Sequence, residues 1–263
     1  MWQYFPYITF SMIGLWLLST FFLYLRKNGV GPAVLLLILA TLIIGVFIAV
    51  LWVKLERPPL RTMAETRIWY AFFLGAIGVI LFYMYRQKWM LSYSAAMGAV
   101  FILVTFFRPD SFNKTLMPAL QSVWFIPHVV VYIFAYAMLG MATVVALKGV
   151  YNHRKNLNTA PTLVIADRLV NVGYAFLTFG LLFGALWAKE AWGHYWTWDP
   201  KETWAFISWL GYLIYIHYRF KYKNTKAITS FTIIIIAFLL ILVCWFGVNY
   251  LPTASQSVHT YSG

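Results

Sequence analysis

The stretch VGPAVLLLILATLIIGVFIAVLWV, residues 30–53, runs for 24 residues without a charged side chain. A transmembrane helix needs about 20 mostly apolar residues to cross the hydrocarbon core of a bilayer. In lipid such a segment has to be a helix, because every backbone polar group needs a partner within its own segment. The run at 30–53 therefore predicts a membrane-spanning helix.

The rest of the chain repeats this pattern. We predict eight spans, at 8–25, 30–53, 69–86, 90–107, 128–147, 169–188, 202–218 and 228–248. The composition agrees, because 62% of the 263 residues are hydrophobic and only 10% are charged, against about 25% charged in an average soluble domain. We therefore expect an all-α protein, a polytopic transmembrane helix bundle that forms a single membrane domain over residues 1–263.

The basic side chains are divided unequally between the two ends of these spans. The connections after spans one, three, five and seven hold 12 lysines and arginines, and the other end holds 8. Cytoplasmic connections are enriched in these residues, so we expect both termini and the connection at 188–203 to be non-cytoplasmic. Glu65, before span three, would pair with Arg67 or another base at that outer end. The net charge of +13 lies in such short connections, so we expect no nucleic-acid partner.

The connection between spans six and seven holds an aromatic motif. It reads Trp-Gly-His-Tyr-Trp-Thr-Trp-Asp-Pro from residue 192 to residue 200, and six of the 13 tryptophans lie between Trp187 and Trp209. Tryptophan and tyrosine collect at membrane interfaces, because one end of each ring is apolar and the other end can hydrogen-bond. The motif is therefore compatible with an interfacial belt and with a surface for a flat aromatic ligand.

Three of the five histidines fall at the same end of the spans as this motif. His128 opens span five, His259 lies in the tail after span eight, and His194 lies within the motif. Two neutral imidazoles on opposite faces of a porphyrin are the axial ligands of a six-coordinate haem iron. His128 and His259 could supply such a pair. Their spacing leaves a second interpretation, in which both are interfacial histidines in contact with lipid headgroups.

Asp199 starts the sequence Asp-Pro-Lys-Glu, which is typical of a helix start. Aspartate is a favoured N-cap, proline suits the first helical position, and glutamate three residues after the cap completes a capping box. We therefore expect Asp199 to begin span seven rather than to act as an acid or base. His217 lies at the other end of that span, about 26 Å away. An ionisable residue in a span predicts a functional site, although a solvated histidine beside Arg219 is the alternative.

Taken together, these residues resemble a known family. The segment from 192 to 204 is similar to the tryptophan-rich WWD motif of haem-handling proteins, in the version carried by the CcsA (ResC) family of cytochrome c biogenesis proteins. The similarity continues at 184–188, at 215–219 and at 258–261 in the tail. It is strong from about residue 120 onward and weaker over the first 110 residues, where 62–69 is the best local match.

The resemblance implies a protein that binds haem b without a covalent bond and presents it for attachment to apocytochrome c. In the family, one histidine before the motif and one after the last spans are axial ligands of the external haem, and His128 and His259 match them. His217 matches a further histidine that holds haem on its way across the membrane, together with a histidine of a partner chain. The expected haem surface consists of Trp192, Tyr195, Trp196, Trp198 and Asp199.

The resemblance also implies the partners. They are a CcsB (ResB) membrane protein, the Cys-x-x-Cys-His segment of apocytochrome c, and membrane lipid. The chain contributes no nucleophile, so we expect it to be a subunit of a holocytochrome c synthase complex. We expect the bacterial cytoplasmic membrane, with the thylakoid membrane as the alternative. Three other functions compete with this one. A CcmC-type haem-handling protein has fewer spans, and a haem-binding electron carrier would place histidine pairs in the bilayer core. A haem-free transporter would carry a buried acid or a Gly/Pro break at mid-depth of a span.

Overall fold

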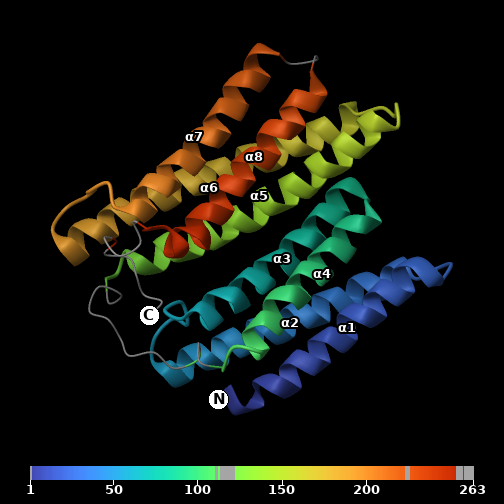
Figure 1. The fold of residues 1–263 in the computed structure, drawn as a ribbon. Coiled ribbons are helices and arrows are strands. Elements are labelled where there is room, and N and C mark those ends of the chain that lie inside the picture. The colour runs from blue at the N-terminus through green and yellow to red at the C-terminus, as the bar shows by residue number, and fades with distance from the viewer. Residues whose placement is uncertain (1, 110–111, 113–121, 223–225, 253–256, 258–263) are drawn as a thin grey trace. The chain divides into compact units, whose positions relative to one another are not determined.

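The computed structural model describes residues 2–109, 112, 122–222, 226–252 and 257 (Figure 1). Within them every regular element is helical, which confirms the predicted all-α class. The α-helices are α1 (Phe5–Leu25), α2 (Val30–Leu55), α3 (Met63–Tyr85), α4 (Lys88–Phe106), α5 (Phe125–Arg154), α6 (Ala160–Trp192), α7 (Pro200–Lys221) and α8 (Ala227–Trp245). Two short 3-10 turns flank them, η1 (Trp2–Tyr4) and η4 (Gly247–Tyr250).

Seven of the described helices, α1 to α6 and α8, are long and apolar enough to cross a membrane. The eighth, α7, is 22 residues long but carries acidic and basic residues in its first turn and basic residues in its last turn. These charges lie at the ends of α7, where a spanning helix meets the polar interface. The chain is therefore an integral membrane protein with the polytopic helical architecture that its sequence predicts.

Most helices begin and end close to the predicted limits, but α5 and α6 are longer than their predicted spans. They have 30 and 33 residues, because a helix continues through polar residues after the apolar segment that hydropathy detects. At its far end α6 continues to Trp192 and is ended by Gly193, whose φ of +85° is the left-handed conformation of a helix C-cap. The connection to α7 is consequently shorter than the predicted 188–203 and covers residues 193–199.

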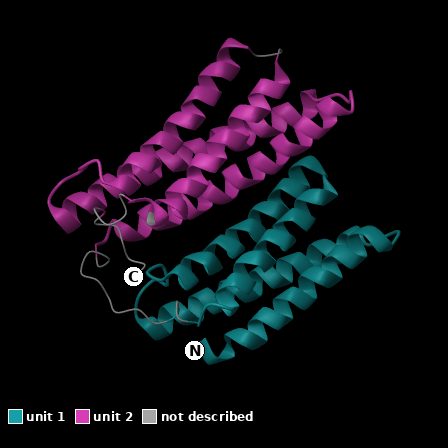
Figure 2. Ribbon diagram, in the orientation of Figure 1, with its two compact units in different colours: residues 1–120 teal, residues 121–263 magenta. Residues whose placement is uncertain are grey.

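The chain divides into two compact units, residues 1–120 and 121–263 (Figure 2). Unit 1 contains α1 to α4, and unit 2 contains α5 to α8. The single membrane domain predicted over residues 1–263 stays a prediction.

Small residues allow the helices of unit 1 to pack closely. A Cβ atom on Gly75 would lie 2.3 Å from Oγ1 of Thr41, and one on Gly78 would lie 2.1 Å from Oγ of Ser94. Glycine at such positions brings helix backbones together in a bilayer, where packing rather than the hydrophobic effect drives association. These contacts join α2 to α3 and α3 to α4.

The start of α3 is closed by a buried ion pair. Glu65 is 1% exposed, and its two carboxylate oxygens accept hydrogen bonds of 2.9 and 3.1 Å from the guanidinium of Arg57. The same carboxylate accepts from the main-chain N–H of Thr62, whose hydroxyl accepts from Glu65 N in return. Of the bases at this end of the spans, the fold thus selects Arg57 as the partner of Glu65.

Unit 2 is a four-helix arrangement in which α5 packs on α6 and α8, and α7 packs on α6 and α8. Glycines of α6 face large side chains of α5: a Cβ atom on Gly173 would lie 2.6 Å from Leu139, and one on Gly180 would lie 3.0 Å from the ring of Tyr132. The closeness of α5 and α6 therefore depends on these glycines. The close packing of α5 on α6 positions the candidate site.

Candidate functional site

His128 lies in the first turn of α5 and is half-buried against α6. Its Nδ1 atom is 2.9 Å from the main-chain carbonyl oxygen of Gly180. A carbonyl oxygen can only accept, so Nδ1 carries a proton and donates, and in the neutral ring the lone pair is at Nε2. A second partner that fixes the tautomer and orientation of the ring is the usual arrangement behind a histidine that binds a metal.

Two glycines of α6 make room for the rings of α5. A Cβ atom on Gly184 would lie 2.7 Å from Cε1 of His128. Gly180 faces Tyr132 in the same way, and the four-residue spacing places both glycines on one face of α6. The sequence prediction missed these two residues, because the only available signal was a pair of glycines four residues apart, without the identity of the helix that they face.

A series of aromatic rings connects the motif to His128. Trp192, at the end of α6, lies 4.9 Å from Trp187 between ring centroids, and Trp187 lies 5.3 Å from His128 in a stacked orientation. His128 then contacts Tyr132, which contacts Tyr136. These contacts place His128, Tyr132 and Tyr136 on one face of α5. Trp187, at the centre of this series of rings, is buried and only 3% exposed.

Two other tryptophans of the motif, in the connection at 193–199, pack against α7. Trp196 and Trp198 contact each other nearly edge to face at 5.8 Å, and both contact Phe206. Phe206 in turn stacks on Trp209. The indole N–H of Trp196 is buried and has no hydrogen-bond partner within the described residues. Trp196 and Trp198, in the connection before α7, therefore pack against Phe206 of that helix.

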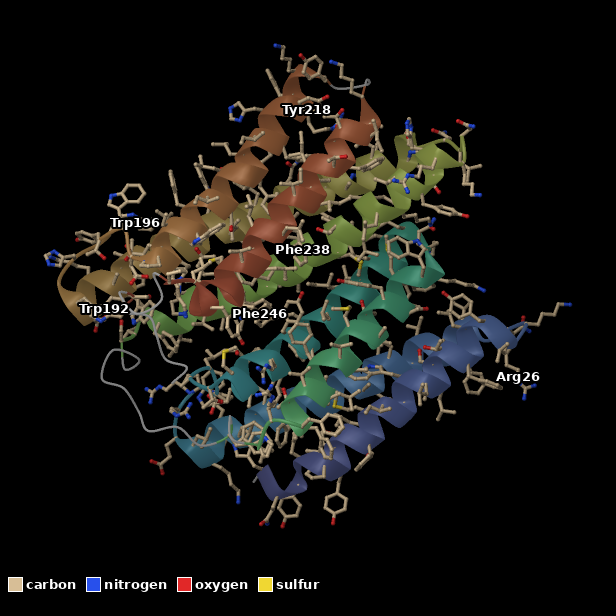
Figure 3. All side chains as sticks on the ribbon, in the orientation of Figure 1. Arg26, Trp192, Trp196, Tyr218, Phe238 and Phe246 are labelled. Carbon is tan, nitrogen blue, oxygen red and sulfur yellow. The ribbon has the colours of Figure 1, made fainter. Side chains whose placement is uncertain are left out.

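The connection between α6 and α7 is held by its own polar contacts. Nζ of Lys189 donates to the carbonyl oxygen of Gly193 at 2.8 Å and lies 5.4 Å from the ring centroid of Tyr195. Trp198 has a φ of +61°, a conformation that is rare for a bulky residue and is typical of functional loops. Both Tyr195 and Trp198 are exposed. Figure 3 labels Trp192 and Trp196, which lie at the same end of unit 2.

Asp199 begins α7, as predicted. Its Oδ1 accepts from the main-chain N–H of Lys201 at 2.8 Å, and the Glu202 carboxylate accepts from Asp199 N, which completes the capping box. The same Oδ1 also accepts from the hydroxyl of Ser257 at 2.9 Å, and both residues are buried. The aspartate of the motif therefore holds the C-terminal tail at the start of α7. His259, two residues further on, lies outside the described residues.

His217 lies at the other end of α7 and is exposed. Its Nδ1 atom is 2.9 Å from the carbonyl oxygen of Leu213 in the same helix, so Nδ1 donates and in the neutral ring the lone pair is at Nε2. Tyr218, the next residue, lies at the end of unit 2 opposite to Trp192 in Figure 3. The structure thus brings His128 together with part of the motif and separates His217 from both.

Comparison with known proteins identifies the family. The family described as cytochrome C assembly protein matches residues 4–255. The chain belongs to the CcsA family of cytochrome c assembly proteins. The cytochrome c biogenesis protein CcsA of Chlamydomonas reinhardtii is 31% identical over 84% of this chain and 66% of its own length. The CcsA proteins of Trachelium caeruleum and Spinacia oleracea are 32% and 31% identical, over 82% and 80% of each chain respectively. This chain therefore acts in cytochrome c biogenesis.

This CcsA-family chain has a further polar group at the His217 end, which the sequence prediction missed. Arg219 donates two hydrogen bonds of 2.8 Å to the carboxylate of Asp167 on α6, and the hydroxyl of Tyr215 donates to the same carboxylate at 2.6 Å. The prediction placed Asp167 in a connection, but it lies within α6. The available signal was that Asp167 is the only one of the seven acids at that end of the predicted spans. The ion pair fixes the end of α7 that carries His217.

Proposed function

We propose that this CcsA-family chain binds haem at the motif end of unit 2 and presents it for covalent attachment to apocytochrome c. The observation that carries the proposal is the hydrogen bond from Nδ1 of His128 to the carbonyl of Gly180, beside the space left by Gly184. It provides an oriented neutral imidazole, with its lone pair on Nε2, among aromatic side chains. Haem iron takes such an imidazole as an axial ligand, and a porphyrin plane suits apolar walls.

We propose His259 as the second axial ligand. The support is the hydrogen bond between Ser257 and Asp199, which attaches the tail to the motif. His259 follows Ser257 by two positions in the sequence. When bound, haem supplies the vinyl groups to which the two thiols of the Cys-x-x-Cys-His segment add. The role of His128 and His259 is to hold the reactants in position.

The residues of the motif would form the haem surface in two parts. Trp192 belongs to the group that includes His128, whereas Trp196 and Trp198 line α7. The buried N–H of Trp196 is a donor without an acceptor, and a propionate carboxylate is an acceptor of suitable chemistry. Tyr195 and Asp199 complete the set, with Asp199 acting through the helix cap and the tail.

We propose that His217 holds haem at the opposite end of α7, together with a histidine of a CcsB-type partner. The support is that His217 is exposed, with its lone pair at Nε2. A single exposed imidazole provides one axial ligand, so a second ligand has to come from another chain. We also propose that the motif and both termini are non-cytoplasmic, as the distribution of basic residues predicts, and that the membrane is the bacterial cytoplasmic membrane.

The absorption spectrum of the protein, purified with its CcsB-type partner, tests the axial ligands. His128→Gly and His259→Gly should each disturb the spectrum of a low-spin haem, and added imidazole should partly restore it, because imidazole enters the space of the missing side chain. The matched control is His153→Gly, which removes an exposed histidine from the last turn of the same helix as His128. An unchanged spectrum in both test variants would remove the proposal.

A further inference from the structure

One guanidinium nitrogen of unit 1 is shielded from solvent and has no hydrogen-bond partner within the described residues. Arg67 lies in the second turn of α3, and its Nη1 atom is shielded from solvent and has no hydrogen-bond partner within the described residues. Arginine keeps its charge at every relevant pH. A charged donor that is buried without an acceptor is more costly than a neutral one. The structure thus indicates that an acceptor for Arg67 comes from elsewhere.

A second arginine, Arg108, adds to the positive charge around Arg67. Arg108, two residues after the end of α4, lies close enough to Arg67 for the two guanidinium groups to repel each other. Helices α3 and α4 pack side by side, and Arg67 near the start of α3 is at the same end of this pair as Arg108. Two positive groups in a partly dry environment concentrate a positive potential that attracts an anion.

The acidic groups of unit 1 do not neutralise Arg67. The carboxylate of Glu65 accepts four hydrogen bonds, two from Arg57 and one each from the main-chain N–H of Arg61 and Thr62. Three of these hydrogen bonds are accepted by Oε2 and one by Oε1, and none of them comes from Arg67. The other described acid of this unit, Glu56, is exposed at the end of α2.

Other positive charges lie close together near the start of α3. Burial lowers the pKa of Arg61, and repulsion by Arg57 lowers it further, whereas Glu65 raises it. An additional anion would therefore relieve repulsion around the start of α3, where the helix dipole also favours negative charge.

We propose that Arg67 and Arg108 form a binding site for an oxyanion, a phosphate or carboxylate group. A planar guanidinium binds such a group through two parallel hydrogen bonds, and the buried Nη1 of Arg67 supplies one of the donors. A lipid headgroup and a soluble anion share this chemistry. The proposal rests only on residues of unit 1 and is independent of the haem site.

Thermal unfolding of the delipidated protein in detergent, at constant ionic strength, tests this site. Replacing chloride by saturating inorganic phosphate should raise the Tm of the wild type by about 3 °C. Arg67→Gln should abolish this shift. The matched control is Arg86→Gln, which removes an exposed arginine from the other end of the same helix and should keep the shift.

Separate titrations with short-chain phosphatidylglycerol and with inorganic phosphate distinguish the two sources. A shift that saturates at a lower concentration of the lipid identifies a headgroup, and the reverse order identifies a soluble anion. In both cases the Tm of Arg67→Gln should not change when the lipid or the phosphate is added.

Three results would overturn the proposal. The first is a wild type that responds to neither anion, and the second is an equal response of Arg67→Gln and Arg86→Gln. The third concerns Asp110, two residues after Arg108 in the sequence. If Asp110→Asn and Arg67→Gln each lower the Tm without added anion, and the double variant is no less stable than either one, the chain supplies its own acceptor.

Discussion

His128 and His217 have the same local chemistry in two different settings. In each, Nδ1 lies 2.9 Å from a main-chain carbonyl oxygen. The carbonyl that holds His128 belongs to Gly180 on the neighbouring helix, and the ring is half-buried among aromatic side chains. The carbonyl that holds His217 belongs to Leu213 in the preceding turn, and the ring is exposed. The first setting is built by the packing of two helices, whereas the second needs another surface to complete it.

The strongest way to break this comparison is to fill the space beside His128. We expect Gly184→Val to displace the imidazole, because the added Cβ atom would lie 2.7 Å from the ring, and to destabilise the fold by about 1–3 kcal/mol. The low-spin haem spectrum should be lost, as in His128→Gly. Gly14→Val, at a position with open space around the Cβ atom, is the control. A normal spectrum in Gly184→Val would show that the packing of α5 on α6 does not position the ligand.

The next largest effect is expected at the end of α7 that carries His217. We expect Asp167→Asn to weaken the attachment of α7 to α6 by about 2 kcal/mol, because the Arg219 guanidinium would keep only part of its partner. Thermal unfolding of Asp167→Asn, Arg219→Gln and the double variant measures this coupling. The losses of stability in the two single variants should not add up to the loss in the double variant. The spectrum that depends on His128 should persist, and its loss would mean that the two ends of unit 2 are not independent.

A smaller effect is expected where the tail meets the motif. Ser257→Ala removes one buried hydrogen bond to Asp199 and should cost about 1 kcal/mol. Asp199→Ala removes that bond and the N-cap as well, so it should cost about 1 kcal/mol more. Thermal unfolding compares the two variants. If the tail positions His259, the spectrum of Ser257→Ala should resemble that of His259→Gly in part, and an unchanged spectrum would limit Asp199 to its role as a helix cap.

The smallest effect on stability is expected at His217. His217→Gly removes an exposed ring. We therefore expect it to lower the free energy of unfolding by no more than other exposed helix positions changed to glycine, about 1 kcal/mol. Cytochrome c assembly in cells should nevertheless fall, while haem that is added to the purified protein should still give the His128-dependent spectrum. Unchanged assembly would favour the alternative of a solvated histidine at the end of the helix.

Much of the fold could be predicted because its causes are local. The run at 30–53 predicted α2, which ends at Leu55, since the bilayer sets the length of a span and forces its backbone to bond internally. The sequence from Asp199 to Glu202 predicted a helix start that the structure confirms. The prediction fell short at α6, which begins at Ala160 rather than at residue 169, because polar residues can continue a helix beyond its apolar segment.

The candidate site was predictable only in its parts. Sequence pattern selected His128 and the aromatic motif, but it did not show that Trp187 packs on His128 while Trp196 and Trp198 pack against Phe206 of α7. It also did not identify the glycine that holds the imidazole. Such assignments depend on which helix faces meet.

The sequence by itself determined the eight long helices of the described residues, most of their limits, the helix cap at Asp199 and the residues that resemble the CcsA family. Only the tertiary structure decided that Gly180 orients His128, that Arg57 neutralises Glu65 and that Ser257 binds Asp199. The physical reason is that hydropathy and capping act within a few residues, whereas these contacts join residues that lie up to 58 positions apart. The contact of His128 with Gly180 in addition needs glycines that allow α5 and α6 to approach.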